Sequence, residues 1–315
     1  MNRPPSILVD TGFEVDQNGA LTEIVIPNVV TTLDPPKKIV FNGTALNWIP
    51  SPVAVLEELE VYNVNIWDTE ILKSYTALQT VRLHDVSTMT LYGLGNYGKY
   101  GQFRGCTALA AFYAPKLKNI ICSSTSSTSG TTETFGDCTN LHIVEMPLLQ
   151  TIVDTNAGNS NGATSGVFRG CTGLQSIDLP ELISITSSNT NTNNTYNGVF
   201  LNCVNLATFK ADKLEEIKGS YATNARGGCF CGCTSLDDVN LPSIKNITSY
   251  QFWGCTGLTN VTLGSEGHPV ESLGSDVFYN CTQSGLTITI YTTGGASLAG
   301  EPWGATNADI EYEEA

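Results

Sequence analysis

The sequence repeats one apolar spacing, and its clearest copy spans Val167–Ile185. When Phe168 is counted as position zero, positions +3, +6, +9, +11, +14 and +17 are Cys, Leu, Ile, Leu, Leu and Ile. A fixed-period apolar pattern is typical of a solenoid, in which each turn buries its apolar edge against its neighbours. The pattern therefore predicts one elongated domain rather than two globular ones. The same spacing starts again from Phe103, Phe135, Phe200 and Phe230.

The turns differ in length because residues are inserted at one position of the repeat. Successive phenylalanines are 32, 33, 32, 30, 22 and 26 residues apart along Phe103, Phe135, Phe168, Phe200, Phe230, Phe252 and Phe278. The shortest turn thus has 22 residues, and the long insertions follow position +17. Insertions at one phase of a solenoid emerge at one edge, so we expect a row of polar loops beside a regular sheet. They cover residues 92–101, 122–130, 154–162, 187–195 and 219–227.

Two short extended pieces are expected in each turn. Around Ile177 and Leu179 the apolar positions alternate with period two, which is typical of a strand. Pro180 ends this strand because proline donates no hydrogen bond to a ladder. Leu182 and Ile185 belong to the second piece. The sequence therefore predicts a mainly β solenoid with little helix, in which short parallel strands stack into one main sheet and a second, weaker ladder.

The two ends of the chain depart from the repeat. We expect residues 1–20 to form an N-terminal lead-in or cap, because terminal repeats are atypical where one side faces water. The solenoid itself is expected over residues 21–291. Residues 292–315 are expected to form a C-terminal cap in which Trp303 packs over the open end.

Charge and hydropathy narrow the class of partner. The 315 residues contain 15 Lys and Arg against 30 Asp and Glu, a net charge of −15. Binding to nucleic acid or to an anionic membrane surface depends on basic side chains, so we expect neither partner. No apolar run is long enough to span a bilayer, and the first residues lack the apolar core of a signal peptide. Either the chain is not exported by that route or a leader has been removed, and its oligomeric state is open.

Most of the cysteines share one column of the repeat. Stacked turns would place them in a ladder inside the coil, where free cysteine behaves as a small hydrophobe, so we expect unpaired thiols. Cys229-x-Cys231-x-Cys233 lacks the two-residue gap of zinc knuckles and has no nearby histidine, so no metal site is expected there. A local disulfide such as Cys122–Cys229 is left open. Position +3 is occupied by Cys106, Cys138, Cys171, Cys203, Cys233, Cys255 and Cys281.

Three short motifs are similar to known sites by their letters only. Gly93–Gly98 matches the dinucleotide fingerprint but does not join a strand to a helix within a βαβ unit. Gly158–Gly162 matches a nucleophile elbow around Ser160 but lacks a partnering histidine. Asp154–Asn159 is similar to a calcium loop but has no closing glutamate. We therefore expect no catalytic, cofactor-binding or metal-binding residues.

The outward side chains of the main strands are the best candidates for ligand contact. With positions +9 and +11 inward, positions +8 and +10 point outward. Tyr113 lies beside Ile143, an exposed aromatic and aliphatic pair of the kind enriched in binding hot spots. Ordinary cross-strand packing is the alternative explanation. The predicted ligand-binding residues are Arg82, Tyr113, Ile143, Glu145, Asp178 and Lys210.

The pattern Phe-x-x-Cys-x-x-Leu-x-x-Ile-x-Leu-Pro-x-Leu-x-x-Ile closely resembles the BspA-like class of leucine-rich repeat. Seven Phe-x-x-Cys matches carry the resemblance, which covers residues 20–312. It implies a leucine-rich-repeat solenoid that has no catalytic motif and is secreted or displayed at a bacterial cell surface. Such a protein is expected to act in adhesion, binding a protein or glycan on a host or neighbouring cell. Similar repeats occur in phage tail-associated proteins, so a structural, virion-associated presentation protein is the alternative.

Overall fold

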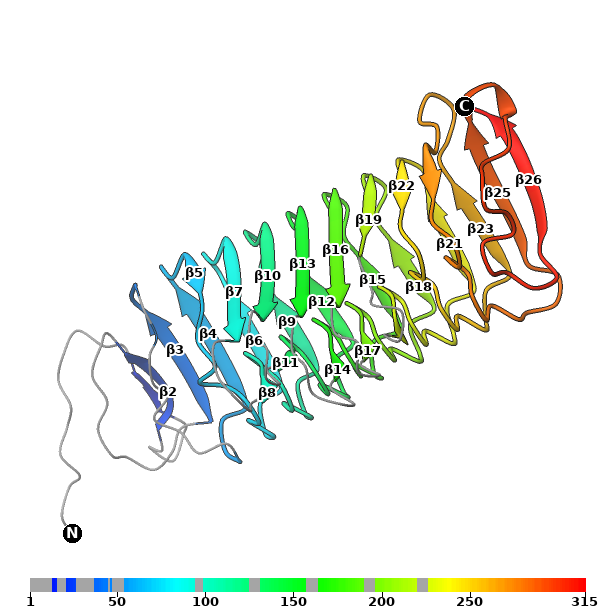
Figure 1. The fold of residues 1–315 in the computed structure, drawn as a ribbon. Coiled ribbons are helices and arrows are strands. Elements are labelled where there is room, and N and C mark those ends of the chain that lie inside the picture. The colour runs from blue at the N-terminus through cyan, green and yellow to red at the C-terminus, as the bar shows by residue number, and fades with distance from the viewer. Residues whose placement is uncertain are drawn as a thin grey trace, which may run out of the picture.

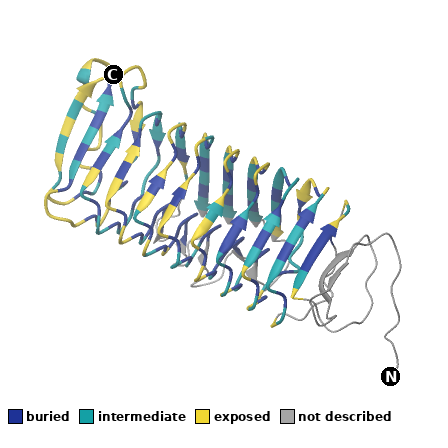
Figure 2. Cartoon of the chain, turned by 180° about the vertical axis from the view of Figure 1, so that it is seen from behind, coloured by how far each residue is buried: buried dark blue, intermediate teal, exposed yellow. Residues whose placement is uncertain are grey.

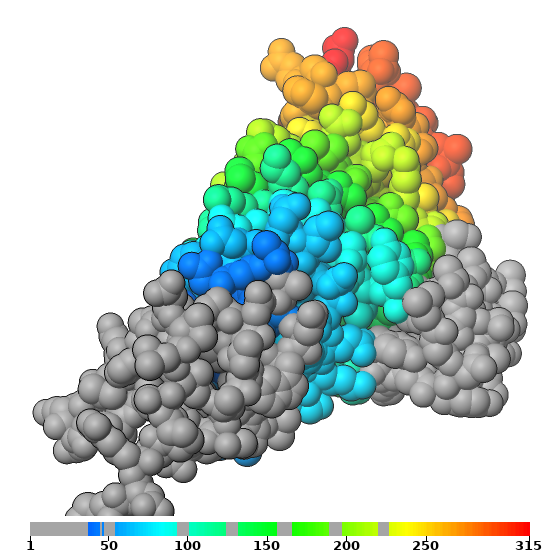
Figure 3. Space-filling view, turned by 90° about the vertical axis from the view of Figure 1, so that its left-hand side faces the viewer, coloured from blue at the N-terminus to red at the C-terminus, as the bar shows by residue number. Residues whose placement is uncertain are grey.

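The computed structural model describes residues 13–15, 21–26, 37–44, 46, 54–93, 99–124, 131–156, 164–189, 196–219 and 226–315. Their strands stack along one axis into an elongated coil that ends at β26 (Figure 1). Viewed from the N-terminal end, successive turns lie one behind another (Figure 3). The only helical element of these residues is a 3₁₀ turn at Thr293–Gly295. The predicted mainly β solenoid with little helix is confirmed.

The strands at positions +8 to +10 form the main ladder, in which neighbours pair in parallel apart from the first two strands, which are antiparallel. Hydrogen bonding divides it into two sheets, with the division between β12 and β15. The first sheet contains, in order, β1 (Phe13–Val15), β2 (Leu21–Ile26), β3 (Lys38–Asn42), β4 (Glu58–Tyr62), β6 (Thr80–Leu83), β9 (Ala111–Tyr113) and β12 (Ile143–Glu145). The second contains β15 (Ser176–Asp178), β18 (Thr208–Lys210), β21 (Asp238–Leu241), β23 (Asn260–Leu263), β25 (Thr287–Thr292) and β26 (Asp309–Glu314).

The strands that begin near position +16 form the second ladder, one continuous eight-stranded parallel sheet. It is not the weaker ladder that the sequence predicted, because its central strands have six residues where the main strands of the same turns have three. The first residues of the insertions lengthen it, since Cys122, Asp154 and Ser187 pair in register. The sheet contains β5 (Ile66–Trp67), β7 (Thr88–Gly93), β10 (Asn119–Ser124), β13 (Thr151–Asn156), β16 (Ser184–Asn189), β19 (Glu216–Lys218), β22 (Asn246–Ile247) and β24 (Ser272–Leu273).

A third ladder forms where the insertions return to the coil. Its two-residue strands pair in parallel, β8 with β11, and β17 with both β14 and β20. Residues at the ends of the insertions thus pair as strands, and the residues between these ends, where the sequence predicts polar loops, lie outside the described residues. These strands are β8 (Lys99–Tyr100), β11 (Thr131–Thr132), β14 (Thr164–Ser165), β17 (Tyr196–Asn197) and β20 (Arg226–Gly227).

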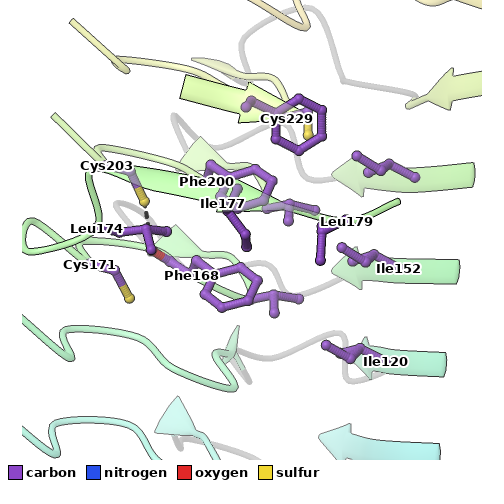
Figure 4. Packing of buried hydrophobic residues seen from close by; sticks show 14 of the residues in the cluster. Ile120, Ile152, Phe168, Cys171, Leu174, Ile177, Leu179, Phe200, Cys203 and Cys229 are labelled. Atoms are coloured by element: carbon purple, nitrogen blue, oxygen red, sulfur yellow. Dashed lines mark hydrogen bonds between the residues drawn. The ribbon is translucent and has the colours of Figure 1, made fainter. Parts of the chain in front are cut away.

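The phenylalanines at position zero form the centre of the core. Buried and exposed residues alternate along the main strands (Figure 2), and the phenylalanine rings face one another across the turns (Figure 4). The ring centroids of Phe168 and Phe200 lie 5.2 Å apart, with 3° between the ring planes. Aromatic pairs of this kind contribute about 0.5–1.5 kcal/mol beyond the burial of their area. Stacked contacts continue through Trp67, Phe103, Phe135, Phe168, Phe200, Phe230, Phe252 and Phe278.

The cysteines at position +3 are buried free thiols, as predicted. The Cys203 thiol donates a hydrogen bond of 3.0 Å to the carbonyl oxygen of Phe168, one turn earlier. The same oxygen accepts the backbone N–H of Cys171 at 3.1 Å, so one carbonyl joins two turns. The bond recurs at all seven positions of the column. The three cysteines outside the column are also free and buried, namely Cys122, Cys229 and Cys231.

A residue with left-handed backbone at position +2 turns the chain between the phenylalanine and the cysteine. Asp137 has a φ of 61° and Asn202 a φ of 56°. Gly, Asn and Asp are the residues that adopt this conformation most readily, which explains the choice of residue there. The column is Gly105, Asp137, Gly170, Asn202, Gly232, Gly254 and Asn280.

The C-terminal residues continue the solenoid. The Phe278 N–H donates to the Trp303 carbonyl oxygen at 2.9 Å, as the Phe252 N–H does to Val277. Trp303 is buried, and β26 pairs with β25 over six residues. β26 is the last strand of its sheet and carries Asp309, Glu311, Glu313 and Glu314. The domain boundaries themselves (1–20, 21–291 and 292–315) stay predictions.

Alkaline pH should unfold this protein because of its thiols. Burial raises the pKa of Cys203 to about 12 and that of Cys171 well above its ordinary value. An unfolded thiol ionises near pH ~8.5, so the unfolded state loses its proton first and stability falls as pH rises from there towards the folded pKa. The loss is about 2 kcal/mol per thiol at pH ~10. We therefore expect Tm, measured by thermal unfolding, to decrease steeply above pH ~8.5.

The Cys203→Ala variant provides the control for this effect. Because this variant lacks one buried thiol, its unfolding at alkaline pH should release about one proton fewer than that of the wild type. Native thiols should also resist iodoacetamide until the chain unfolds, because the reactive thiolate is not formed. A Tm that does not change between pH ~8 and ~10 would contradict this account.

Candidate binding face

The outward side chains of the main ladder form one long face of the solenoid. On β15 and β18 the outer residues are exposed and the central residue is buried, as positions +8 and +10 require. Ala111 is an exception, because it occupies position +8 and is nevertheless buried. The six predicted ligand-binding residues all lie on this face, on strands β6, β9, β12, β15 and β18.

Three of these residues form a row across neighbouring strands. Tyr113 is directly paired with Arg82 on one side and with Glu145 on the other. The Arg82 guanidinium carbon lies 5.0 Å from the centroid of the Tyr113 ring, a cation–π contact. This contact fixes the ring against the sheet and leaves it half-buried.

Ile143 is the exposed apolar residue of the face, with 37% of its surface accessible. Its direct partner in the sheet is Ala111 rather than Tyr113. Tyr113 and Ile143 are thus diagonal neighbours, a separation of about 7–8 Å that an aromatic side chain still bridges. The shared face and the register both follow the repeat, because Ala111 and Ile143 occupy position +8 whereas Tyr113 and Glu145 occupy position +10.

The remaining two predicted residues lie beyond the division of the main ladder. Asp178 and Lys210 are directly paired between β15 and β18, and both are exposed. The Lys210 ammonium lies 3.8 Å from a carboxylate oxygen of Asp212. The structure therefore separates them from the Arg82, Tyr113 and Glu145 row, which belongs to the other sheet.

A charged cluster that the sequence analysis missed adjoins the row. Glu60 lies within 3.5 Å of Lys38, 3.7 Å of Arg82 and 3.9 Å of His84. Tyr62 donates a hydrogen bond of 3.2 Å to Glu60, and its ring stacks on His84 with centroids 4.1 Å apart. We call these five residues the Glu60 cluster. Their signal in the sequence was the alternation of charged and aromatic residues at outward positions of adjacent turns.

A buried ion-pair network lies at the edge where the insertions return. Nε of Arg104 donates to Glu133 at 2.6 Å, and Nε of Arg169 donates to the other oxygen of Glu133 at 2.8 Å. Arg169 also pairs with Asp137. Burial alone would lower the pKa of Arg169, but Glu133 and Asp137 together raise it above its ordinary value. Glu133 itself is completely buried.

Glu133 stands where other turns have glycine. The residue two before the phenylalanine is glycine in three later turns, and at Gly198 an added Cβ would lie 2.0 Å from the carbonyl oxygen of Gly228. Such close contact between turns excludes a side chain there. The break in the glycine column at Glu133 was the signal that could have predicted this network.

Asp154 is a second buried carboxyl group near this edge. It is completely buried on β13, and burial, followed by the charge of Glu133, raises its pKa well above the ordinary value. The calcium-loop motif that begins at Asp154 extends into residues 157–159, outside the described residues. Ser160 and most of Gly93–Gly98 also lie outside them. His142 is exposed, and its Nδ1 lies 2.7 Å from the carbonyl oxygen of Asn140.

The described ranges contain neither a cluster of metal ligands nor a membrane-spanning helix. There, no three side chains of His, Cys, Asp or Glu come together as a metal site would require. No helix of the same ranges is long and apolar enough to cross a membrane.

A family model supports the repeat assignment for part of the chain. A family model described as the BspA type leucine rich repeat region matches residues 159–226 and 223–294, with six copies. Among solved structures, the chain is similar to a leucine-rich repeat protein from Bacteroides ovatus ATCC 8483, at 16% identity over 90% of this chain and 94% of that chain, with a TM-score of 0.29. It is also similar to a leucine rich repeat protein of T. pallidum (21% identity, 72% and 87% covered, TM-score 0.28). A leucine rich cell surface protein from Faecalibacterium prausnitzii A2-165 matches at 14% identity, with 98% and 95% covered and a TM-score of 0.23. No curated protein matches the chain.

Removal of the Glu133 charge should destabilise the fold. In the Glu133→Gln variant two half-buried guanidinium groups lose the buried carboxylate that they share, which costs about 3–5 kcal/mol in comparable buried pairs. Chemical denaturation should show this loss. The exposed pair Glu181–Lys213, 2.7 Å apart, is the control, and Glu181→Gln should cost less than about 1 kcal/mol. Equal losses for the two variants would contradict a structural role of the network.

Proposed function

The chain is a leucine-rich repeat protein of the BspA type, matched over residues 159–294, and we propose that it is a non-enzymatic recognition protein. In this proposal a protein or glycan ligand binds to the outward face of the main ladder and to the adjoining polar insertions. Solenoids typically use such extended surfaces for binding. The proposal also includes display at the cell surface or secretion, because the BspA-like resemblance implies it.

One observation carries the proposal. Exposed Ile143 lies diagonally beside Tyr113, whose ring contacts Arg82, on strands whose inward residues pack against the common core. An apolar residue, an aromatic ring and a guanidinium group in one patch are the components of protein-binding hot spots. Because the strands below them are rigid, little conformational entropy would be lost on binding.

A binding role fits the chemistry of the chain better than catalysis. Its strongest potential nucleophiles are the cysteine thiols, and all ten are buried. Burial raises the pKa of Cys106 and Cys281 to about 12, so these thiols stay protonated at neutral pH. The exposed face presents ion-paired and apolar side chains instead, which suit recognition.

The proposed face can be tested with a binding screen and two matched variants. The intact solenoid would be screened against matrix proteins, mucins and glycans, and the affinity of each ligand found would be measured again after Tyr113→Ser with Ile143→Ser. We expect at least a roughly thirty-fold loss of affinity, which corresponds to a hot spot. Ile183→Ser is the control, because Ile183 is similarly exposed (44%) but lies away from the main ladder.

Two results would count against this proposal. A screen with no ligand from any of these classes would reject the recognition role. Equal affinity of the double variant and the Ile183→Ser control would reject the face as its site.

A further inference from the structure

The inward side chains of the second ladder change from apolar to polar where the insertions join it. Leu91, Cys122, Asp154 and Ser187 occupy directly paired positions on β7, β10, β13 and β16. All four are buried. Directly paired residues point to the same side of a sheet, so this column presents an alkyl group, a thiol, a carboxyl group and a hydroxyl group to the interior.

Asp154 is the member of this column that most needs a partner. Neither of its carboxyl oxygens has a hydrogen-bond partner among the described residues, and the Ser187 hydroxyl has none either. Thr132 on β11, a strand with Cα atoms within 8 Å of β13, adds a second buried hydroxyl group without a partner among the described residues. These three residues hold four of the seven unpartnered buried polar side-chain atoms in the described part of the chain. A buried carboxyl group in that state is strongly destabilising.

The charged groups around Asp154 do not supply the missing partner. Glu133 acts on Asp154 with charge of the same sign. The two nearby guanidinium groups, of Arg104 and Arg169, already donate to Glu133. Within the described ranges Asp154 has no ion pair of its own, so a positive charge is lacking at this point of the interior.

We propose that Asp154, together with the hydroxyl groups of Ser187 and Thr132, binds a hard cation of the Ca²⁺ class inside the solenoid. Carboxylate and neutral oxygen ligands are the donors that Ca²⁺ prefers, completed by water. The neighbouring thiol of Cys122 is held 3.0 Å from the Thr134 hydroxyl, which leaves the donor set oxygen-only. A single carboxylate implies weak binding, in the range of about 10⁻⁴–10⁻³ M.

This site differs from the calcium-loop motif in the sequence. The motif would use consecutive residues of one insertion, whereas the proposed ligands come from β11, β13 and β16 in three successive turns. A bound cation would therefore link three turns of the coil at the foot of the insertions. Because only the folded chain brings these residues together, the cation would stabilise the folded state. The inference does not depend on the proposed recognition function.

The test measures cation binding and stability on the full chain after treatment with a chelator. Equilibrium dialysis against Ca²⁺ should find one ion per chain, and Tm should rise with Ca²⁺ and then saturate. Asp154→Asn should abolish both effects, and Ser187→Ala should raise the Ca²⁺ concentration at half-saturation several-fold. Asp178→Asn, which removes an exposed carboxylate from β15, should behave like the wild type.

Separate arms identify the cation. Tm would also be measured in NaCl and in choline chloride at equal ionic strength, because only NaCl supplies a small cation. A rise of Tm in NaCl that is absent in choline chloride would overturn the Ca²⁺ assignment. If the wild-type chain binds no Ca²⁺ in dialysis, the proposed site is wrong. This measurement does not depend on whether any variant folds. A Tm that is higher for Asp154→Asn than for the wild type at every Ca²⁺ concentration would show that the carboxyl group stays protonated and unpartnered.

Discussion

The hydrogen bond from each cysteine thiol at position +3 to a backbone carbonyl of the preceding turn is the contact on which the rest of the coil depends. The acceptor is Leu72 for Cys106 and a phenylalanine for the other six. The Phe168 oxygen accepts the N–H of Cys171 in its own turn and the thiol of Cys203 in the next. The bond sets the spacing between turns at a point where the phenylalanine rings also stack. Cysteine suits the position because it is small and apolar and still has a weak donor. Alanine would leave the carbonyl with one partner fewer.

The surfaces of the molecule follow from this regular interior. Because every turn has the same inner columns, outward residues of adjacent turns are held side by side, and Arg82, Tyr113 and Glu145 form a row without any loop to position them. The insertions all leave the coil at one phase, so their ends can pair with one another in the second and third ladders. The main face thus carries a fixed pattern of side chains, whereas the opposite edge carries the variable part of each turn.

The sequence predicts those features that the apolar repeat determines. Phe168, Cys171 and Ile177 could be placed in the core because their spacing recurs and their burial is favourable in every turn. Period-two alternation also showed that Tyr113 and Ile143 share a face. The repeat also gives the register, because Ala111 and Ile143 both occupy position +8 of their turns and pair directly in the sheet.

Polar residues inside the fold were harder to predict. Glu133 and Asp154 stand in stretches rich in Thr, Asn and Gly, where the composition indicates loops, and the structure buries both. The Glu60 cluster was missed although Lys38, Glu60 and Arg82 recur every 22 residues, because its members belong to three different turns. In each case the burial or pairing is produced by contacts between turns, which a single sequence does not contain.

The acidic last strand has a consequence for how copies of this chain meet. β26 has a neighbour only on one side within its sheet, so its other edge offers unpaired backbone groups to any strand of matching register. Four of its six residues are acidic, and the chain contains no Lys or Arg after Lys245. Two such ends would repel each other, and head-to-head joining of coils through this edge is disfavoured. The negative charge of this strand therefore disfavours growth of the coil into a filament through pairing of two β26 edges.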